Sequence, residues 1–196
     1  MVGVAFSTQV TVDPSFYPVK FSASSLPKGL SINATTGVIS GVPTEVCEKT
    51  IVVSAACTAV KKAASGKTEL PVAVRSFPKA AVGAFTCDYI DFWDGPLALA
   101  DDVQAKATTS LSISEKGKLA GKIKVGTKSY SFTAGSFRFV DADGGVTLVA
   151  STTLKVGKKS YAVEIRLHGD DVLIVDLAYT YGGKEAGFAA LQPPPQ

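Results

Sequence analysis

Apolar and polar residues alternate along most of this chain, which is the pattern of half-buried β-strands. The most apolar stretch of the N-terminal part, 50–56, is expected to be a central strand. Pro71 lacks a backbone N–H, so the strand that contains it is expected at a sheet edge. In this part the alternation predicts strands at 4–12, 17–22, 30–33, 38–40, 50–56 and 68–75.

The second part of the chain shows stricter alternation, interrupted by tight turns. The phrases KVGTKSY and KVGKKSY repeat one turn chemistry at 124–130 and 155–161. Consecutive strands with such short links predict an antiparallel up-and-down barrel, with a curved open sheet or a second sandwich as alternatives. The strands are expected at 83–90, 107–115, 118–125, 128–134, 137–139, 146–156, 159–167, 172–179 and 186–191.

A dense run of turn residues, LPKGLSINATTGVISGVPT, occupies 26–44. Pro27 fixes φ and Gly29 permits a left-handed conformation, so the chain is expected to bend before the strand at 30–33. Asn33 can bond its own backbone, and Gly37 can close the resulting turn. The run therefore predicts a β-arch between two short strands.

The pattern LPxGLxxxxxTGxIxGxP in this run resembles the signature of the immunoglobulin-like domains of bacterial surface proteins, which the cadherin-like domains related to that of dystroglycan share. The resemblance covers roughly 1–76, and Asn33 stands where those families usually carry an acidic residue. It implies an immunoglobulin-like sandwich, in a secreted or envelope protein whose signal peptide has been removed. Such modules serve as spacers, adhesins and appendages of enzymes.

The phrase GKLAGKIKVGTKSYSF resembles, more loosely, a repeat module of large bacterial envelope proteins, over about 83–191. The expected organisation is therefore all-β: an immunoglobulin-like β-sandwich at 1–78, an antiparallel up-and-down β-barrel at 83–191 and a disordered tail at 192–196. The tail reads QPPPQ, which cannot bury apolar surface.

Charge argues against a nucleic-acid partner. The chain carries 20 Lys and Arg against 17 Asp and Glu, and neither half has the strong basic excess of a nucleic-acid-binding protein. No apolar run is long enough for a transmembrane helix, so no membrane insertion is expected. Solvated strand faces and edge protection are favoured over a polyanion site for the lysines at 116, 118, 122, 124 and 128.

Three cysteines allow at most one internal disulfide. Cys47 and Cys57 flank one expected strand and would lie roughly 30 Å apart, too far for a bond. Cys57 and Cys87 are interpreted as small apolar residues. With no CxxC motif and a single histidine, neither a metal nor a cofactor is expected.

The strongest candidate for ligand contact is the segment 88–94. Trp93 and Tyr89 could stack on the apolar face of a sugar ring, while Asp91 and Asp94 bond its hydroxyls. A glycosidase could instead use two of Asp88, Asp91 and Asp94, held roughly 5–9 Å apart. The structural alternative, which the sequence favours, is that Phe92 and Trp93 plug the end of the barrel and the aspartates cap turns.

Other motifs favour structure over chemistry. Asp141 and Asp143 lack the further oxygens of an EF-hand, so a hairpin turn is favoured over a calcium loop. His168 is interpreted as a solvated turn residue rather than a general base, because no GxSxG elbow accompanies it.

The function expected from the sequence is non-enzymatic: a secreted or cell-surface module for adhesion, spacing or glycan contact, with a glycan or a surface protein as partner. Two rivals stay open. One is a small-ligand carrier that uses the barrel interior, and the other is a carbohydrate-active enzyme that uses the aspartates named above. The sequence leaves the oligomeric state undetermined.

Overall fold

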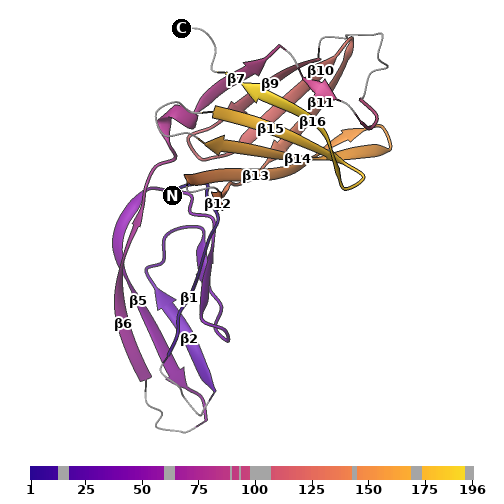
Figure 1. The fold of residues 1–196 in the computed structure, drawn as a ribbon. Coiled ribbons are helices and arrows are strands. Elements are labelled where there is room, and N and C mark those ends of the chain that lie inside the picture. The colour runs from indigo at the N-terminus through magenta and orange to yellow at the C-terminus, as the bar shows by residue number, and fades with distance from the viewer. Residues whose placement is uncertain are drawn as a thin grey trace. The chain divides into compact units, whose positions relative to one another are not determined.

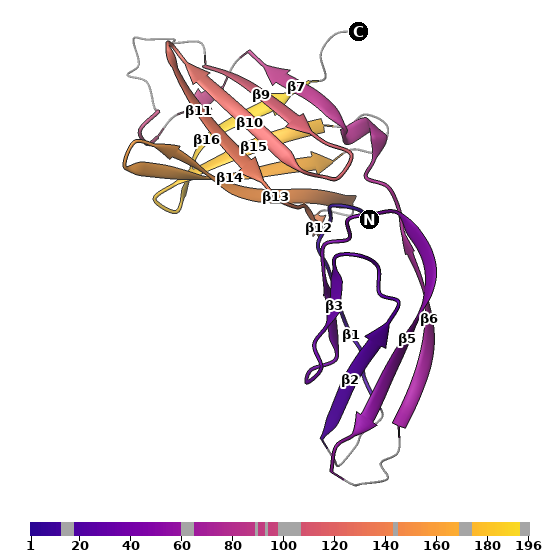
Figure 2. The ribbon, with the colours of Figure 1, turned by 180° about the vertical axis from the view of Figure 1, so that it is seen from behind.

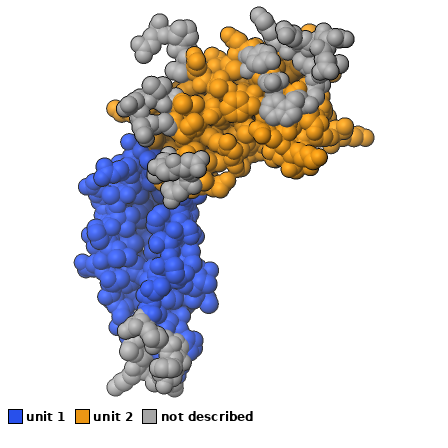
Figure 3. Space-filling model, viewed as in Figure 1, with its two compact units in different colours: residues 1–76 blue, residues 77–196 orange. Residues whose placement is uncertain are grey.

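The structure, a computed structural model, describes residues 1–12, 18–59, 65–88, 90–92, 94–97, 107–142, 145–168 and 174–192. The chain divides into two compact units, Met1–Ser76 (unit 1) and Phe77–Gln196 (unit 2), coloured separately in Figure 3. The described residues form antiparallel strands and one single-turn 3-10 helix, Lys79–Ala81, so the all-β prediction is confirmed.

Unit 1 consists of two three-stranded sheets (Figure 1). The strands of the first, in the order β1-β4-β3, are β1 (Phe6–Gln9), β4 (Val38–Gly41) and β3 (Leu30–Ile32). The strands of the second, in the order β2-β5-β6, are β2 (Val19–Ser24), β5 (Cys47–Cys57) and β6 (Ser65–Val74). The apolar strand β5 is central and the Pro71 strand β6 lies at an edge, as predicted. Ile39, Ile51 and Val53 form the core of the unit.

The glycines of the signature motif allow two backbone segments to touch. Gly41 pairs with Leu30 in the β3–β4 ladder, and the Val42 N–H donates to the Gly29 carbonyl at 3.1 Å. A Cβ on Gly29 would collide with the Val42 carbonyl, and a Cβ on Gly41 would collide with the Gly29 carbonyl. Both glycines also have positive φ, 93° and 141°, which side chains disfavour.

Asn33 builds the turn between β3 and β4. Its Oδ1 accepts hydrogen bonds from the backbone N–H groups of Thr35 at 2.9 Å and Thr36 at 3.0 Å. Gly37, with a φ of 74°, donates its N–H to the Asn33 carbonyl at 2.8 Å. The predicted β-arch is therefore a hairpin closed by an Asx turn, and an amide oxygen provides the acceptor that an acidic residue would also provide.

Unit 2 contains one four-stranded and one six-stranded sheet (Figures 1 and 2). The strands of the four-stranded sheet are β11 (Lys128–Ala134), β10 (Leu119–Val125), β9 (Ala107–Ile113) and β7 (Gly83–Cys87), in that order. The strands of the six-stranded sheet are β12 (Arg138–Ala142), β13 (Gly145–Val156), β14 (Lys159–His168), β15 (Ile174–Tyr181), β16 (Lys184–Leu191) and β8 (Asp91–Phe92), also in order.

The closed up-and-down barrel predicted for 83–191 is wrong, because the described strands form two sheets whose ladders do not join. Strand β12 pairs with β13 along Gly145–Val149. Strand β11 can therefore lie beside β13 only beyond Val149. There the Thr152 hydroxyl donates to the Thr133 carbonyl at 2.6 Å. At the other seam one bridge joins Thr86 to Gln192, so the predicted disordered tail is paired at its first residue; 193–196 lie outside the described residues.

The space between the two sheets of unit 2 is filled with side chains. Tyr161, Leu177 and Tyr179 of the six-stranded sheet are fully buried, and Leu111 and Ile123 of the four-stranded sheet are buried likewise. Phe92 packs 4.8 Å from Tyr179 and 5.4 Å from Tyr161, measured between ring centroids. The described residues therefore provide no open barrel interior of the kind that the carrier hypothesis requires.

Candidate functional site: a charged groove on the six-stranded sheet

The structure describes only part of the segment that the sequence predicts to contact sugar. Tyr89 and Trp93 lie outside the described residues. Asp91 begins β8 and pairs with Phe188 of β16, although its side chain is not described. Asp94 has an exposed side chain whose Oδ1 accepts a hydrogen bond from the Gly95 N–H at 2.6 Å. The sugar-contact role of these four residues stays a prediction.

Tyr161 fixes the backbone that follows β8. Its hydroxyl donates to the Asp94 carbonyl at 2.9 Å and accepts from the Leu97 N–H at 2.8 Å. A Cβ on Gly95, which has a φ of 86°, would lie 2.7 Å from the Tyr161 hydroxyl oxygen. Burial of Tyr161 raises its pKa, with the neighbouring Asp94 charge as a smaller cause. The segment is thus held against the core, with Phe92 buried beneath it.

A charged groove that was not among the sequence-based predictions lies on the outer face of the six-stranded sheet. Its volume is about 480 Å³. It arises from the alternation in β14, where Tyr161, Val163, Ile165 and Leu167 are buried and the residues between them face outward. The groove is lined by Arg138, Val140, Thr147, Val149, Glu164, Arg166, His168 and Asp176.

Glu164 connects two arginines across three strands. The Arg166 Nε–H donates to Glu164 Oε1 at 2.8 Å, and Arg138 Nη2 lies 3.7 Å from Glu164 Oε2. These side chains are between 36% and 54% exposed, so each ion pair stabilises the fold by only about 0–1 kcal/mol. Their polar atoms remain accessible to a ligand.

His168 and Asp176 form the second charged pair of the groove. His168 Nε2 and Asp176 Oδ2 are 2.6 Å apart, and an ionised carboxylate only accepts, so the ring N–H is the donor. The His168 side chain is 36% exposed and that of Asp176 15%. The interpretation of His168 as a solvated turn residue is therefore corrected: it ends β14, and its ring is oriented by a carboxylate on the next strand.

The groove lacks the hydrogen bond that would prepare a nucleophile. Thr147 lines it together with His168, yet among the described residues no hydrogen bond joins the two side chains. Nucleophilic catalysis needs such a bond between the attacking hydroxyl and its base. What the groove does present is alternating donors and acceptors on a rigid sheet face.

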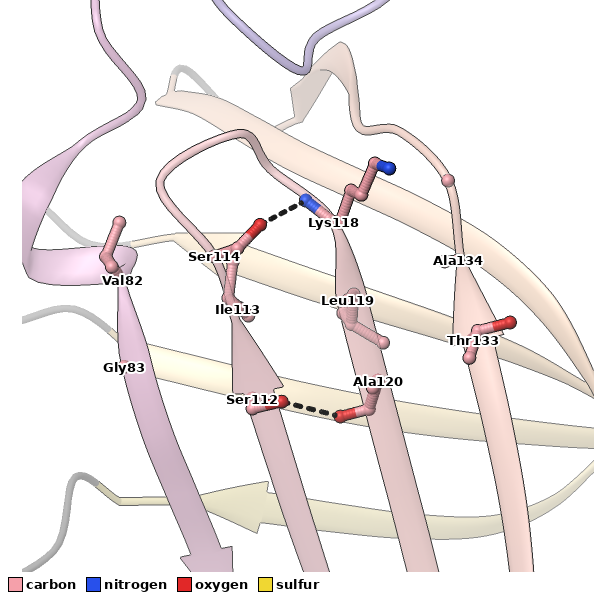
Figure 4. Close-up of a pocket in the computed structure, with 11 residues that line it drawn as sticks. Val82, Gly83, Ser112, Ile113, Ser114, Lys118, Leu119, Ala120, Thr133 and Ala134 are labelled. Atoms are coloured by element: carbon pink, nitrogen blue, oxygen red, sulfur yellow. Dashed lines mark hydrogen bonds between the residues drawn. The ribbon is translucent and has the colours of Figure 1, made fainter.

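A second groove, of about 720 Å³, lies at one end of the four-stranded sheet (Figure 4). Ser114 Oγ accepts from the Lys118 N–H at 3.1 Å, and the Ser112 hydroxyl reaches the Ala120 carbonyl at 3.5 Å. The other lining side chains are mostly small or apolar, such as Val82 and Ala134. This groove has fewer polar groups to orient a ligand than the charged groove.

A third, apolar groove of about 280 Å³ lies in unit 1, between the edge strands β1 and β6. Phe6 and Leu70 line it and are 45% and 37% exposed. The groove contains no charged side chain. It therefore has little with which to orient a polar ligand.

The described part of the chain offers few groups for metal binding or thiol chemistry. There, no three His, Cys, Asp or Glu side chains gather into a group that could hold a metal ion. Cys47 and Cys57 begin and end the uninterrupted strand β5, and both thiols are free. Among the described residues, no helix has the length and apolar character needed to cross a bilayer.

Residues 1–73 match the model of the family described as "Putative Ig domain". The immunoglobulin-like resemblance predicted for the N-terminal half is therefore confirmed. No curated protein and no solved structure matches the chain. A domain of this family fits a non-enzymatic surface module in general, and such domains are commonly extracellular.

The sequence contained a signal for the charged groove. Glu164, Arg166 and His168 alternate with the apolar residues of β14, so their common face could have been inferred from the period of two. Arg138 and Asp176 could not be added in the same way, because they come from β12 and β15. Only the strand register brings them beside β14.

Proposed function

We propose that this protein is a non-enzymatic secreted or envelope module for adhesion, in which unit 2 contacts glycans through the charged groove and unit 1 acts as a spacer. The observation that carries the proposal is the pairing of Arg166 with Glu164 and of His168 with Asp176 in one groove. Sugar hydroxyls both donate and accept, so a surface with adjacent fixed donors and acceptors suits them.

The pairing also orients the groove before a ligand arrives. Glu164 bonds the guanidinium of Arg166, and Asp176 bonds the imidazole of His168, so part of the side-chain freedom is already restricted before binding. Charged partners that are already neutralised by each other favour a neutral polyhydroxyl ligand over a strongly charged one. A glycan is thus a better match than a free ion.

An exposed aromatic ring extends the same face. Glu164 pairs with Ala178 across β14–β15, and Ala178 pairs with Phe188 across β15–β16. Residues paired in this way lie on the same face of the sheet, so the ring of Phe188 lies on the face of Glu164 and is 38% exposed. Two strand spacings separate Phe188 from Glu164, a distance of roughly 10 Å. The backbone of Asp91 pairs with Phe188 in turn, so β8 lies next to the strand that carries this ring.

The carrier and enzyme alternatives have less support. The carrier would need the open interior that buried side chains occupy in the described residues. The enzyme would need two convergent carboxylates, whereas Asp88 and Asp94 are both exposed and the Asp91 side chain is not described. A surface protein as partner in adhesion remains compatible with the proposal.

A glycan array tests the proposal directly. We expect wild-type protein to bind a subset of neutral glycans, and Arg166→Ala to weaken that binding roughly tenfold or more, because a charged hydrogen bond is lost. Arg75→Ala, an exposed arginine of unit 1, is the matched control and should bind as wild type does. Absence of wild-type binding, or equal binding by Arg166→Ala, would remove the groove from consideration.

The same array separates the groove from the segment 88–94. If Trp93→Ala loses binding while Arg166→Ala keeps it, the contact lies in the segment predicted from sequence. If both variants lose binding, both the groove and the segment contribute to glycan contact.

A further inference from the structure

We infer that one end of unit 2 is a docking surface for an anionic polysaccharide, formed by a row of lysines on three hairpins. The lysine row consists of Lys124, Lys128, Lys155, Lys158, Lys159 and Lys184, all of them exposed. The β10–β11, β13–β14 and β15–β16 hairpins end on the same side of unit 2 in both Figure 1 and Figure 2.

Tight turns bring these lysines to the hairpin tips. Gly126, Gly157 and Gly182 have φ values of 58°, 63° and 59°, which permit two-residue links between paired strands. Lys128 pairs with Val125 at the first tip, and Lys159 pairs with Val156 at the second. The repeated KVGxKSY sequence thus forms a lysine-bearing hairpin tip at two places in the unit.

Contacts link neighbouring hairpins, but only the second and third are linked at their tips. The hydrogen bond from Thr152 to the Thr133 carbonyl places β13 beside β11 across the seam between the sheets. Lys159 Nζ lies 5.9 Å from the centroid of the Tyr181 ring, which joins the second tip to the third. Lysines from two sheets therefore lie on the same side of unit 2.

Edge protection accounts for only part of the row. Lys128 lies on the edge strand β11, and Lys155 lies beyond the part of β13 that β12 covers. Lys124, in contrast, lies on β10 between β9 and β11 and is paired on both sides. Lys116 and Lys118, grouped with Lys124 in the sequence analysis, instead belong to the turn at the other end of β10. The predicted hairpin cluster is thus divided between two ends of the unit.

The row is not neutralised within the described residues. None of its six lysines forms an ion pair there. Two acidic residues lie near the second and third hairpins: Glu185 follows Lys184 in β16, and Asp94 bonds the Ala186 carbonyl and the Tyr161 hydroxyl through its backbone. Adjacent cations repel one another, and a polymer with repeated negative charge would relieve that repulsion.

The tips favour a soluble polymer over a lipid surface. Their central residues are Gly126-Thr127, Gly157-Lys158 and Gly182-Gly183, with no large apolar side chain to enter a bilayer. The row uses none of the groove residues, so this inference does not rest on the proposed binding of neutral glycans.

Binding to immobilised dextran sulfate, with neutral dextran as reference, tests the inference. The variant Lys155→Gln/Lys158→Gln/Lys159→Gln should bind roughly a hundredfold more weakly than wild type, given about fivefold for each lysine near an anionic surface. The control Lys28→Gln/Lys67→Gln/Lys116→Gln removes the same charge from other exposed lysines and should change affinity less than about twofold. Lys124→Gln/Lys128→Gln, on another hairpin, should also weaken binding.

Each outcome has a defined meaning. Loss confined to the two hairpin variants, with Arg166→Ala unaffected, supports the lysine row and separates it from the groove. Equal loss in the control variant would show that overall charge, and not the row, is responsible. Failure of the wild type to bind dextran sulfate, or stronger binding to phosphatidylglycerol vesicles, would overturn the assignment.

Discussion

The two units reach a β fold by different physical means. Among the described residues, unit 1 buries seven apolar side chains and unit 2 buries 28. Unit 1 instead concentrates positive-φ glycines and prolines in one short motif, where two glycines touch across a hairpin. Unit 2 has long in-register ladders and a buried aromatic cluster around Tyr161 and Tyr179.

This comparison shows where each unit is sensitive to substitution. In unit 1 the glycines of the signature motif determine the path of the backbone. Replacing one of them by a residue with a side chain should therefore lower the free energy of unfolding considerably. In unit 2 packing is distributed over many side chains, so the consequence of a substitution depends on which polar groups it leaves without partners.

The largest effect is expected from Gly41→Ala in unit 1. The new Cβ would meet the Gly29 carbonyl at a φ of 141°, so we expect destabilisation by about 3 kcal/mol or more from strain and overpacking together. Gly66→Ala is the control, since nothing lies within 4 Å of its Cβ position. Hydrogen exchange of the β5 amides measures the difference, and equal protection in the two variants would contradict the motif's backbone role.

A smaller effect separates the two central tyrosines of unit 2. Tyr161→Phe should destabilise the unit by about 1–3 kcal/mol, because the Asp94 carbonyl and the Leu97 N–H lose their partner. Tyr179→Phe should be neutral or slightly stabilising, since neither its buried hydroxyl nor that of Thr109 makes a hydrogen bond of ordinary geometry. Urea unfolding of both variants tests this order, and a larger loss for Tyr179→Phe would reverse it.

The smallest effect is a pH dependence confined to alkaline solution. Burial raises the pKa of Tyr179 well above its ordinary value, and the nearby Thr109 hydroxyl offsets part of that rise. Above pH about 10 an unfolded tyrosine loses its proton while the folded one keeps it, so stability falls as pH rises, by up to about 1.4 kcal/mol per pH unit. Below that pH the tyrosine is protonated in both the folded and the unfolded state, so its contribution to the free energy of unfolding is fully present.

Unfolding of wild type and Tyr179→Phe, compared between pH 9 and 11 at intervals of about half a pH unit, isolates this tyrosine from the lysines, which titrate in both proteins. The variant should show the shallower decline. Parallel curves would mean that the Tyr179 hydroxyl does not resist ionisation in the folded protein.

Local patterns predicted the strands and turns well. The alternation in β14 identified its buried residues, and the arch chemistry of Asn33 and Gly37 is present as predicted. The Phe132 ring on the adjacent strand β11 lies directly over Gly121 of β10. Such features depend on residues close in sequence or on one adjacent strand.

Pairings over longer distances could not be predicted in the same way. The sequence was compatible with a closed barrel in the second half of the chain. In such a barrel β11 would pair with the edge of β13, but β12 pairs there instead. The charged groove depends on the register of β12, β13, β14 and β15 together. His168 could be assigned a partner only once Asp176 was placed on the neighbouring strand.

The sequence by itself therefore determined the local conformation: which segments extend, which face of each strand is apolar and where the backbone reverses. Backbone sterics and the period of two act within a few residues, so they can be read without a fold. Only the tertiary structure decided which strands are neighbours, and with that the open seams, the charged groove and the lysine row. Many strand pairings satisfy the same alternation, and the selection among them depends on contacts between distant segments.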